Sequence, residues 1–191
     1  PISIDWNRFK KSKVKVSNKT KKALDSKNLK VGFAWSGKPT HLRDQVRTMD
    51  ISLFGDLFDS KNTDFFSLQK FSKKEDLKFL DKYKNVYNCE ADLKDFLHTA
   101  YLVNEMDVIL TIDTSLVHMS GTLGKKTFLF LPLVPDFRWG LNKNQEWYPN
   151  LELLRQAKID DWTQPIKEAK NGNNCEVKSL TAIMELYFLL I

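Results

Sequence analysis

The stretch DVILTIDTSLVHMSGTLGKKTFLFLP (residues 107–132) has the pattern of a strand, a tight turn, a short helix and a second strand. Its first apolar run ends abruptly at Asp113, and Thr114 and Ser115 follow directly. A strand, a helix and another strand in this order form a βαβ unit, in which the two strands lie parallel in one sheet. This stretch therefore predicts an α/β fold.

The same alternation of strands and helices extends in both directions along the chain. Besides the strand at 107–112, continuous apolar runs predict five strands, one of them the second strand of this stretch, and apolar residues at helical spacing or turn residues predict helices between and after them. The strands are expected at 31–35, 64–70, 85–90, 126–132 and 151–156, and the helices at 51–60, 73–83, 92–106, 115–124 and 160–172. Strands that are apolar on both faces are typical of parallel sheets covered by helices on both sides. We expect a doubly wound, mostly parallel, Rossmann-like sheet.

Composition and charge narrow the class of protein. The chain has 191 residues, of which 42% are hydrophobic, and only two cysteines, so we expect a globular protein in a reducing, cytoplasmic setting without disulfide bonds. No run of about 20 apolar residues predicts a membrane span. Three separated histidines make a protein-bound metal ion unexpected, and no cofactor is predicted.

The net charge of +6 is concentrated at the N-terminal end of the sequence. Residues 1–30 contain ten Lys and Arg residues and two Asp residues, whereas the rest contains 20 basic and 22 acidic residues. Residues 1–29 are therefore predicted to form a basic arm or linker. Such an arm is usually solvated, and a nucleic-acid-binding role through residues 8–30 is a competing reading. No nucleic-acid partner is expected, because no aromatic residue lies among the lysines after Phe9.

Polar or glycine-containing segments follow each predicted strand, and in a parallel sheet these exits meet at one edge. Among these strand exits, the predicted helix start at Ser115 is the most specific candidate for a ligand site, because helix N-termini present unpaired N–H groups that bind phosphate. Thr114 could add a hydroxyl, and His118 lies in the first turn. A capping turn with a structural histidine explains the same residues equally well. Asp113 could cap the helix or accept hydrogen bonds from sugar hydroxyls.

A loop with glycine and basic residues follows the strand at 31–35. It reads SGKPTHLRDQVRT (residues 36–48) and matches neither the dinucleotide fingerprint GxGxxG nor the P-loop. It could enclose an anionic group from the side opposite Ser115. A solvated basic loop is the alternative.

Four segments resemble the C-terminal half of glycosyltransferases related to the heptosyltransferase family, closest to the branch associated with tetratricopeptide repeats. They are VGFAWSGKPTHLRDQVRTMDISLF, FFSLQK, LKDFLHTAYLVNEMDVILTIDTSLVHMSGTLGKKTFLFLP and VPDFRWGLNKNQEWYPNLELLRQ. The resemblance implies one half of a GT-B fold, in which this half holds the nucleotide-sugar donor. The other half, an N-terminal acceptor domain thought to carry the catalytic base, is missing from this sequence.

The resemblance also implies roles for individual residues. Asp113 would contact the donor sugar, and Thr114, Ser115 and His118 would lie at its diphosphate. Ser36 and Gly37 would line the phosphate loop with Arg47 as a basic contact, Leu93 and Lys94 would lie near the base, and Glu90 would reach the ribose. Arg138 could serve the donor or brace its loop, and bracing is the preferred reading.

The predicted organisation is a basic arm (1–29), a nucleotide-sugar-binding domain (30–172) and a C-terminal helix (173–191) that could mediate oligomerisation. The predicted function is donor binding within a glycosyltransferase, with no catalytic residue assigned in this chain and no transfer by the chain alone. A non-catalytic nucleotide-binding or interaction module of the same fold is the main alternative. A sugar-nucleotide epimerase, which shares the GT-B architecture, is a more distant one.

Overall fold

The computed structural model describes residues 14–141 and 147–171. The predicted C-terminal helix at 173–191 and the first part of the predicted arm lie outside the described residues. Among the described residues, no helix is long and apolar enough to cross a membrane.

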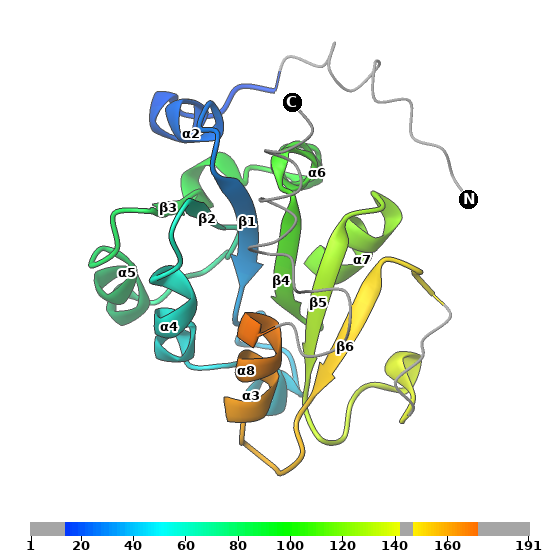
Figure 1. Cartoon of the computed structure of the whole chain (residues 1–191). Helices are drawn as coiled ribbons and strands as arrows, with labels where there is room; N and C mark the ends of the chain where they lie inside the picture. Colours follow the sequence, from blue (N-terminus) through cyan, green and yellow to red (C-terminus); the bar gives the residue numbers. More distant parts are fainter. Residues whose placement is uncertain (1–13, 142–146, 172–191) are drawn as a thin grey trace, which may run out of the picture.

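Six strands form one parallel sheet in the order β3-β2-β1-β4-β5-β6 (Figure 1). They are β1 (Leu29–Ala34), β2 (Thr63–Ser67), β3 (Val86–Asn88), β4 (Val108–Ile112), β5 (Lys126–Leu131) and β6 (Leu151–Arg155). This order confirms the predicted Rossmann-like fold, and every pairing is parallel. The direction in which the chain moves along the sheet reverses between β1 and β4. Ligands of such sheets bind at this switch point, beyond the carboxyl ends of the strands.

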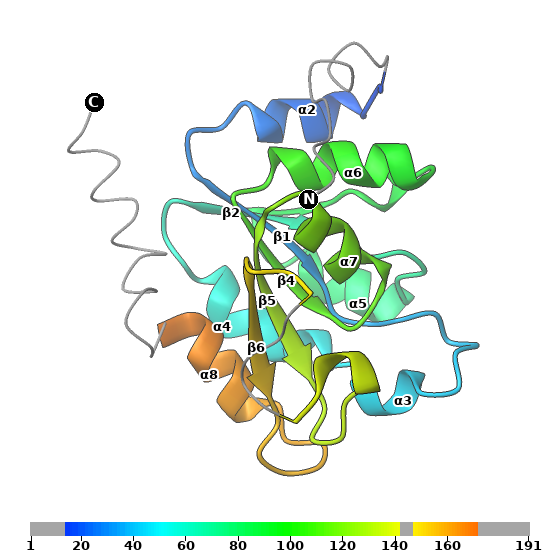
Figure 2. The same ribbon diagram turned by 90° about the vertical axis from the view of Figure 1, so that its right-hand side faces the viewer.

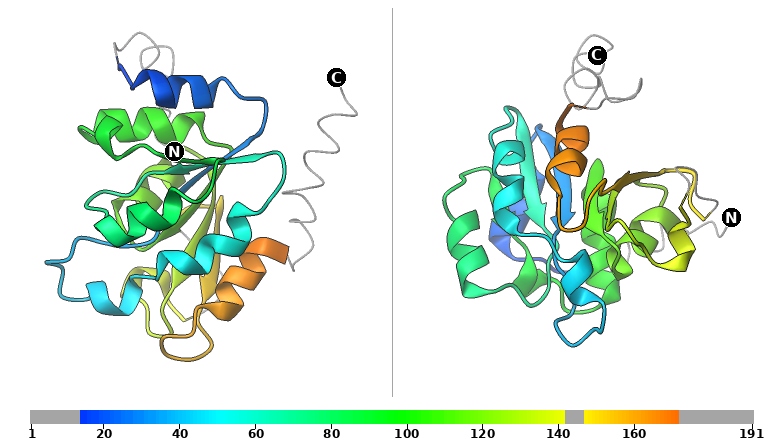
Figure 3. Two further views of the ribbon diagram at one scale, coloured as in Figure 1. Left: turned by 90° about the vertical axis from the view of Figure 1, so that its left-hand side faces the viewer. Right: turned by 90° about the horizontal axis from the view of Figure 1, so that it is seen from below.

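Helices cover both faces of the sheet (Figures 2 and 3). The α-helices are α2 (Asn18–Leu24), α3 (Asp44–Arg47), α4 (Gly55–Phe58), α5 (Lys74–Leu80), α6 (Phe96–Glu105), α7 (Ser115–Thr122) and α8 (Thr163–Asn171). Three 3-10 helices complete the described elements: η1 (Ile51–Phe54), η2 (Glu90–Asp92) and η3 (Phe137–Trp139). Side chains from η1, α4, α5 and α8 pack on one face, and those from α2, α6 and α7 pack on the other.

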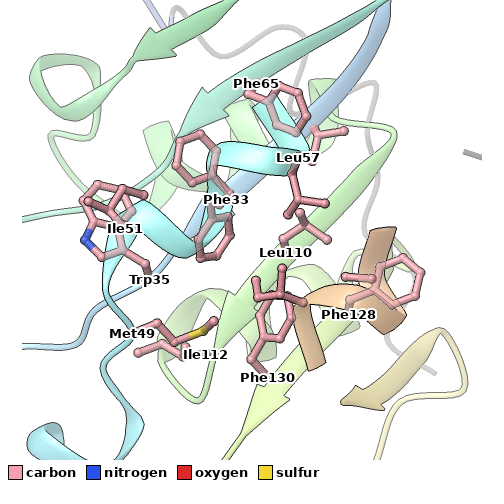
Figure 4. Packing of buried hydrophobic residues seen from close by; sticks show 14 of the residues in the cluster. Phe33, Trp35, Met49, Ile51, Leu57, Phe65, Leu110, Ile112, Phe128 and Phe130 are labelled. Atoms are coloured by element: carbon pink, nitrogen blue, oxygen red, sulfur yellow. The ribbon is translucent and has the colours of Figure 1, made fainter. Parts of the chain in front are cut away.

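The alternation of side chains along each strand divides the core between these two faces. Phe33 lies on the η1–α4 face, in the cluster that contains Ile51 and Leu57 (Figure 4). Its ring is 5.1 Å from that of Phe58 and 5.8 Å from that of Phe54. Its neighbour Ala34 lies on the opposite face, in the cluster that contains α6. Gly32 is also on that side, where an added Cβ would come within 2.7 Å of Ile109. The small residues of β1 therefore let the α6 side approach the sheet closely.

The predicted linker requires a correction, because residues 18–24 form helix α2 and this helix packs against the body. Ser17 caps the helix by accepting a hydrogen bond from the backbone N–H of Thr20. Ala23 is buried in the core cluster of the α6 face. Figure 2 shows α2 lying beside α6. The lysines of this segment lie around a helix whose buried positions are small, so the apolar signal in the sequence is weak.

The remaining predicted elements are present with altered bounds. The segment at 51–60 is a 3-10 helix followed by one turn of α-helix, and the helix predicted from 92 begins at Phe96 after a separate 3-10 turn. Serine is a common capping residue, and Ser72 stands just before α5, but it does not cap that helix. The helix begins after Lys73, whose backbone N–H donates to Asp76 at 3.4 Å, and the Ser72 hydroxyl has no hydrogen-bond partner.

Candidate functional site

A pocket of about 310 Å³ lies at the carboxyl ends of β1, β2 and β4. Four segments line it: the β1 exit with Ser36 and Gly37, the β2 exit with Gln69 to Phe71, the turn before α6, and the start of α7. This is the switch point of the strand order, where the topology of the sheet predicts a ligand site.

Gln69 joins the first two of these segments. This side chain is 3% exposed. Its Oε1 accepts hydrogen bonds from the backbone N–H groups of Trp35 and Ser36 at 3.1 and 3.0 Å. Its Nε2 donates to the carbonyl oxygen of Lys70 at 2.6 Å. A buried amide whose oxygen and nitrogen both bind backbone groups fixes the relative position of the two loops.

Gly37 lines the pocket and lies against the side chains of Asp44 and Arg47. A Cβ at this position would collide with the carboxylate of Asp44 and the guanidinium of Arg47. Those two side chains pair with each other, with Arg47 Nε 3.2 Å from Asp44 Oδ1. A side chain at residue 37 would therefore displace the ion pair that supports the β1 exit loop.

The start of α7 faces the same pocket. Thr114, Ser115 and Leu116 all line it, and Ser115 is exposed. Thr114 is the N-cap residue, and its hydroxyl accepts from the backbone N–H of Leu116 at 3.3 Å. The helix start that the sequence singles out thus opens into the pocket beside Gly37. The positive end of the helix dipole at this point favours an anion.

The charged side chains around the pocket are mainly lysines. Lys38, Lys70 and Lys94 line it and are exposed. Asp95 is the one carboxylate among the lining residues, and its Oδ1 lies 2.7 Å from Nδ1 of His98. It also caps α6 by accepting from the backbone N–H of His98. Hydrogen bonds from His98 lower the pKa of Asp95, so this carboxyl group is a poor proton donor or acceptor near neutral pH.

The β2 exit places a phenylalanine at the pocket in an unusual backbone conformation. Phe71 has φ of 60°, in the left-handed region that non-glycine residues rarely adopt. The carboxylate of Glu90 accepts the backbone N–H of Phe71 at 2.7 Å and that of Ser72 at 3.4 Å. Glu90 therefore holds the loop, and it is not among the lining residues. Phe96, at the start of α6, lines the pocket as well.

A second group of charged residues lies next to the pocket, beyond Gly37, around a small cavity of about 40 Å³. Arg47 donates to the carbonyl oxygen of Asp113 at 2.6 Å. The carboxylate of Asp113 lies 3.5 Å from the guanidinium of Arg138, which also lies 3.1 Å from Asp136. These contacts link the exits of β1, β4 and β5. They also show Arg138 bracing its loop against Asp113.

His118 points away from the lysine-lined pocket, toward the β5–β6 side. Its ring stacks on Trp139 at 5.6 Å, and Nδ1 lies 3.2 Å from the hydroxyl of Tyr148. Burial lowers the pKa of His118, and the positive charge of Arg138 lowers it further, so the imidazole is neutral at pH 7. Gly121 makes room for the ring of Tyr148, whose atoms would lie 2.5 to 2.8 Å from an added Cβ.

Six of the ten predicted site residues line one pocket: Ser36, Gly37, Leu93, Lys94, Thr114 and Ser115. Arg47 and Asp113 line the small neighbouring cavity. Glu90 lies under the β2 exit loop and His118 lies among aromatic rings. Sequence reasoning missed Gln69 as a structural link and missed Phe71 and Phe96. An amide and a phenylalanine in a strand exit were the available signals, but both residue types are common in loops.

Among residues 14–141 and 147–171, no group of three or more His, Cys, Asp or Glu residues is placed to hold a metal ion. Cys89 is buried, and burial raises the pKa of its thiol to about 12. The pocket therefore presents lysine ammonium groups, backbone N–H groups and hydroxyls, which together suit a phosphorylated ligand.

No protein-family model and no curated protein matches the sequence. Solved structures that resemble the chain include two glycosyltransferases. The E. coli heptosyltransferase WaaC with ADP-2-deoxy-2-fluoro heptose has a TM-score of 0.52 at 11% sequence identity, over 91% of this chain and 50% of that chain. The glycosyl transferase family 9 protein from Veillonella parvula DSM 2008 has a TM-score of 0.45 at 16% identity, over 76% of this chain and 40% of that chain.

This chain therefore spans half or less of each of these two glycosyltransferase structures. At such low sequence identity the likeness establishes a common fold. The six-stranded parallel sheet with helices on both faces is a Rossmann-like α/β fold that matches GT-B glycosyltransferases.

Proposed function

We propose that this chain binds a nucleotide-diphosphate sugar in the pocket at the switch point, as the donor-binding half of a glycosyltransferase. The observation that carries the proposal is the meeting of Gly37 and the start of α7 in one pocket. The helix start supplies N–H groups and a partial positive charge, and Gly37 presents only backbone atoms to the pocket. Assignment to the branch associated with tetratricopeptide repeats stays a prediction.

The diphosphate would lie between Ser36 and Ser115, with the lysines of the rim around it. Its negative charge is complementary to Lys38, Lys70 and Lys94. In a transfer reaction these groups would stabilise the charge that develops on the leaving nucleoside diphosphate. Metal-free stabilisation of this kind needs only protein cations and the helix dipole.

The sugar would lie toward Asp113, at the side where Arg47 and Arg138 hold that residue. A carboxylate repels phosphate and accepts hydrogen bonds from sugar hydroxyls. The lysines line the main pocket and Asp113 lines the small neighbouring cavity. A diphosphate at Gly37 with the sugar toward Asp113 would leave the nucleoside in the main pocket.

Isothermal titration with ADP-, GDP- and UDP-sugars tests the proposal. Lys38→Glu and Ser115→Glu each place a negative charge at the expected diphosphate, so each should weaken binding at least tenfold. Lys61→Glu is the matched control, because residue 61 precedes β2 at the opposite edge of the sheet. Absence of binding in the intact chain, or equal losses in all three variants, would refute the proposal.

A non-catalytic nucleotide-binding module of the same fold is the second candidate, because the lining of the pocket accounts for donor binding and a transferase would take its catalytic base from the other half. The described lining residues include no carboxylate or histidine free to act as a base, since Asp95 is held by His98. Supplying a complementary acceptor half separates the two functions. A glycosyltransferase half should then show transfer from a bound donor, whereas a binding module should bind the donor without turnover.

A further inference from the structure

Two exposed phenyl rings, those of Phe71 and Phe96, line the same pocket. Phe71 is 63% exposed and Phe96 is 69% exposed, although large aromatic side chains are normally covered. Among residues 14–141 and 147–171, neither ring stacks on another ring or lies under a cation. They come from different elements, the β2 exit and the start of α6, so a shared structural role in one loop does not explain both.

The conformation of Phe71 is held by a specific contact. Its left-handed backbone is unfavourable for a residue with a Cβ, and the Glu90 carboxylate compensates by binding the two backbone N–H groups at 71 and 72. Glu90 itself is positioned by the side chain of Asn88, which accepts its backbone N–H at 3.0 Å. The exposed ring of Phe71 is therefore carried by a loop that Glu90 holds in place.

The order of strand exits gives the pocket a direction. The β2 exit with Phe71, the β1 exit with Gly37 and the β4 exit with Asp113 and Ser115 follow one another along the sheet, and Arg138, which pairs with Asp113, follows β5 beyond them. A phenyl ring has no group that can bind sugar hydroxyls, but it stacks readily on a flat heterocycle. The carboxylate of Asp113, in contrast, can accept hydrogen bonds from sugar hydroxyls and offers no surface for stacking.

We propose that Phe71 and Phe96 contact the base of the bound nucleotide by stacking, and that Glu90 is a positioning residue that presents Phe71. This rests on the proposed function and deepens it. The base is recognised mainly by its aromatic face, so affinity should follow the stacking surface of the base, with ADP and GDP binding more tightly than UDP.

Titration of ADP, GDP and UDP against inorganic pyrophosphate and a hexose 1-phosphate tests the inference. Phe71→Ala and Phe96→Ala should each weaken nucleoside diphosphate binding about tenfold and leave pyrophosphate binding within about twofold. Phe71→Trp should retain or tighten nucleotide binding. Phe137→Ala is the matched control, because that phenyl ring is 86% exposed on η3 and is not among the lining residues.

The role of Glu90 has its own readout. Glu90→Ala should weaken ADP binding as much as Phe71→Ala, and the double variant should be no weaker than either single variant, because both changes remove one contact. Glu90→Gln keeps an acceptor oxygen and should restore most of the affinity. Additive losses, or an equal loss of pyrophosphate binding, would overturn the positioning role.

The outcomes separate this inference from the function on which it rests. Intact nucleotide binding in both phenylalanine variants overturns the stacking and leaves donor binding standing. If the two phenylalanine variants lose as much affinity for the hexose 1-phosphate as for ADP, the proposed orientation of the ligand is wrong. Absence of nucleotide binding in the unmodified chain overturns both.

Discussion

The hydroxyl of Thr20 donates a 2.6 Å hydrogen bond to the carboxylate of Asp92, which lies 72 residues further along the chain. The same carboxylate accepts from the backbone N–H and the hydroxyl of Ser17, at 2.7 and 3.0 Å. Asp92 is buried, and Leu93 and Lys94 of the pocket follow it directly. One carboxylate therefore fastens helix α2 to the segment that forms a wall of the candidate site.

Replacing Asp92 should release α2 from the body. Asp92→Ala removes three hydrogen bonds to a charged acceptor and leaves the Thr20 hydroxyl buried, so the free energy of unfolding should fall by about 1–3 kcal/mol. Amide hydrogen exchange should show lost protection at residues 18–24. Asp25→Ala, at the end of the same helix, is the control and should leave protection elsewhere in α2 unchanged. Equal protection in both variants would contradict the anchoring role.

Gly121→Ala should destabilise the protein by overpacking. The added Cβ would lie 2.5 Å from the nearest ring atom of Tyr148, and such overlap costs about 1–3 kcal/mol. Urea unfolding measures the loss. Combining Gly121→Ala with Tyr148→Ala should recover part of it, because the second change removes the overlapping ring. If the two losses simply add, the contact does not limit residue 121.

Gly124→Ala provides a contrasting case on the same helix. No atom lies within 4 Å of the added Cβ, but φ is +69°, a conformation that costs an L-residue roughly 1–2 kcal/mol. Gly124→Asn should cost less, because asparagine tolerates this region better. Equal stabilities of the two variants would show that backbone conformation does not determine the preference for glycine here.

His118 should make stability fall as the pH is lowered below neutrality. Its pKa is lowered in the folded protein, first by burial and then by Arg138, while Asp113 and Asp136 act in the opposite direction. The unfolded chain therefore takes up a proton at a higher pH than the folded chain. The stability contributed by the neutral ring is complete above the unfolded pKa of about 6.5, and it is lost as the pH falls through the folded value.

Urea unfolding between pH 5 and pH 7.5 measures this effect. His118→Gln should flatten the pH dependence over that range, whereas His41→Gln, at an exposed loop position, should leave its slope close to that of the unmodified protein. A histidine proton titration by NMR would report the direction of the His118 shift independently. A pKa above the ordinary value would contradict the prediction.

Thr114 should stabilise α7 through its cap. Thr114→Ala removes the acceptor for the Leu116 N–H and should lower the free energy of unfolding by about 1 kcal/mol, while Thr114→Ser should retain most of it. Thermal unfolding of the two variants without ligand gives the comparison. Indistinguishable melting curves would show that the cap contributes little.

The central strands could be predicted from the sequence because they are largely apolar runs, such as FLFL before Pro132 or VILTI before Asp113. Their alternation with helices predicted the parallel direction. Helix bounds were less accurate, since capping depends on backbone geometry that the sequence alone does not specify. Ser72 has the residue type of a cap, yet it lies one position too early. Helix α2 was missed because Asp92, which anchors it, is distant in sequence.

The pocket was predictable where chain topology determines position. Gly37 and Ser115 both follow strands of a parallel sheet, so their meeting at one edge follows from the strand order. The direction of a side chain does not follow from that order. His118 lies in the first turn after Ser115, but its ring stacks on Trp139 and lies beside Tyr148, and it does not line the pocket.

The hydrogen bonds of Gln69 have a kinetic consequence. Its amide binds backbone groups on the β1 and β2 exits. These two loops are therefore held in place in the absence of a ligand. A molecule entering from solvent would meet a preorganised surface and would not have to wait for a loop to close. The association rate would then be set by diffusion and by electrostatic attraction to the lysines. Differences in affinity between ligands would arise mainly from their dissociation rates.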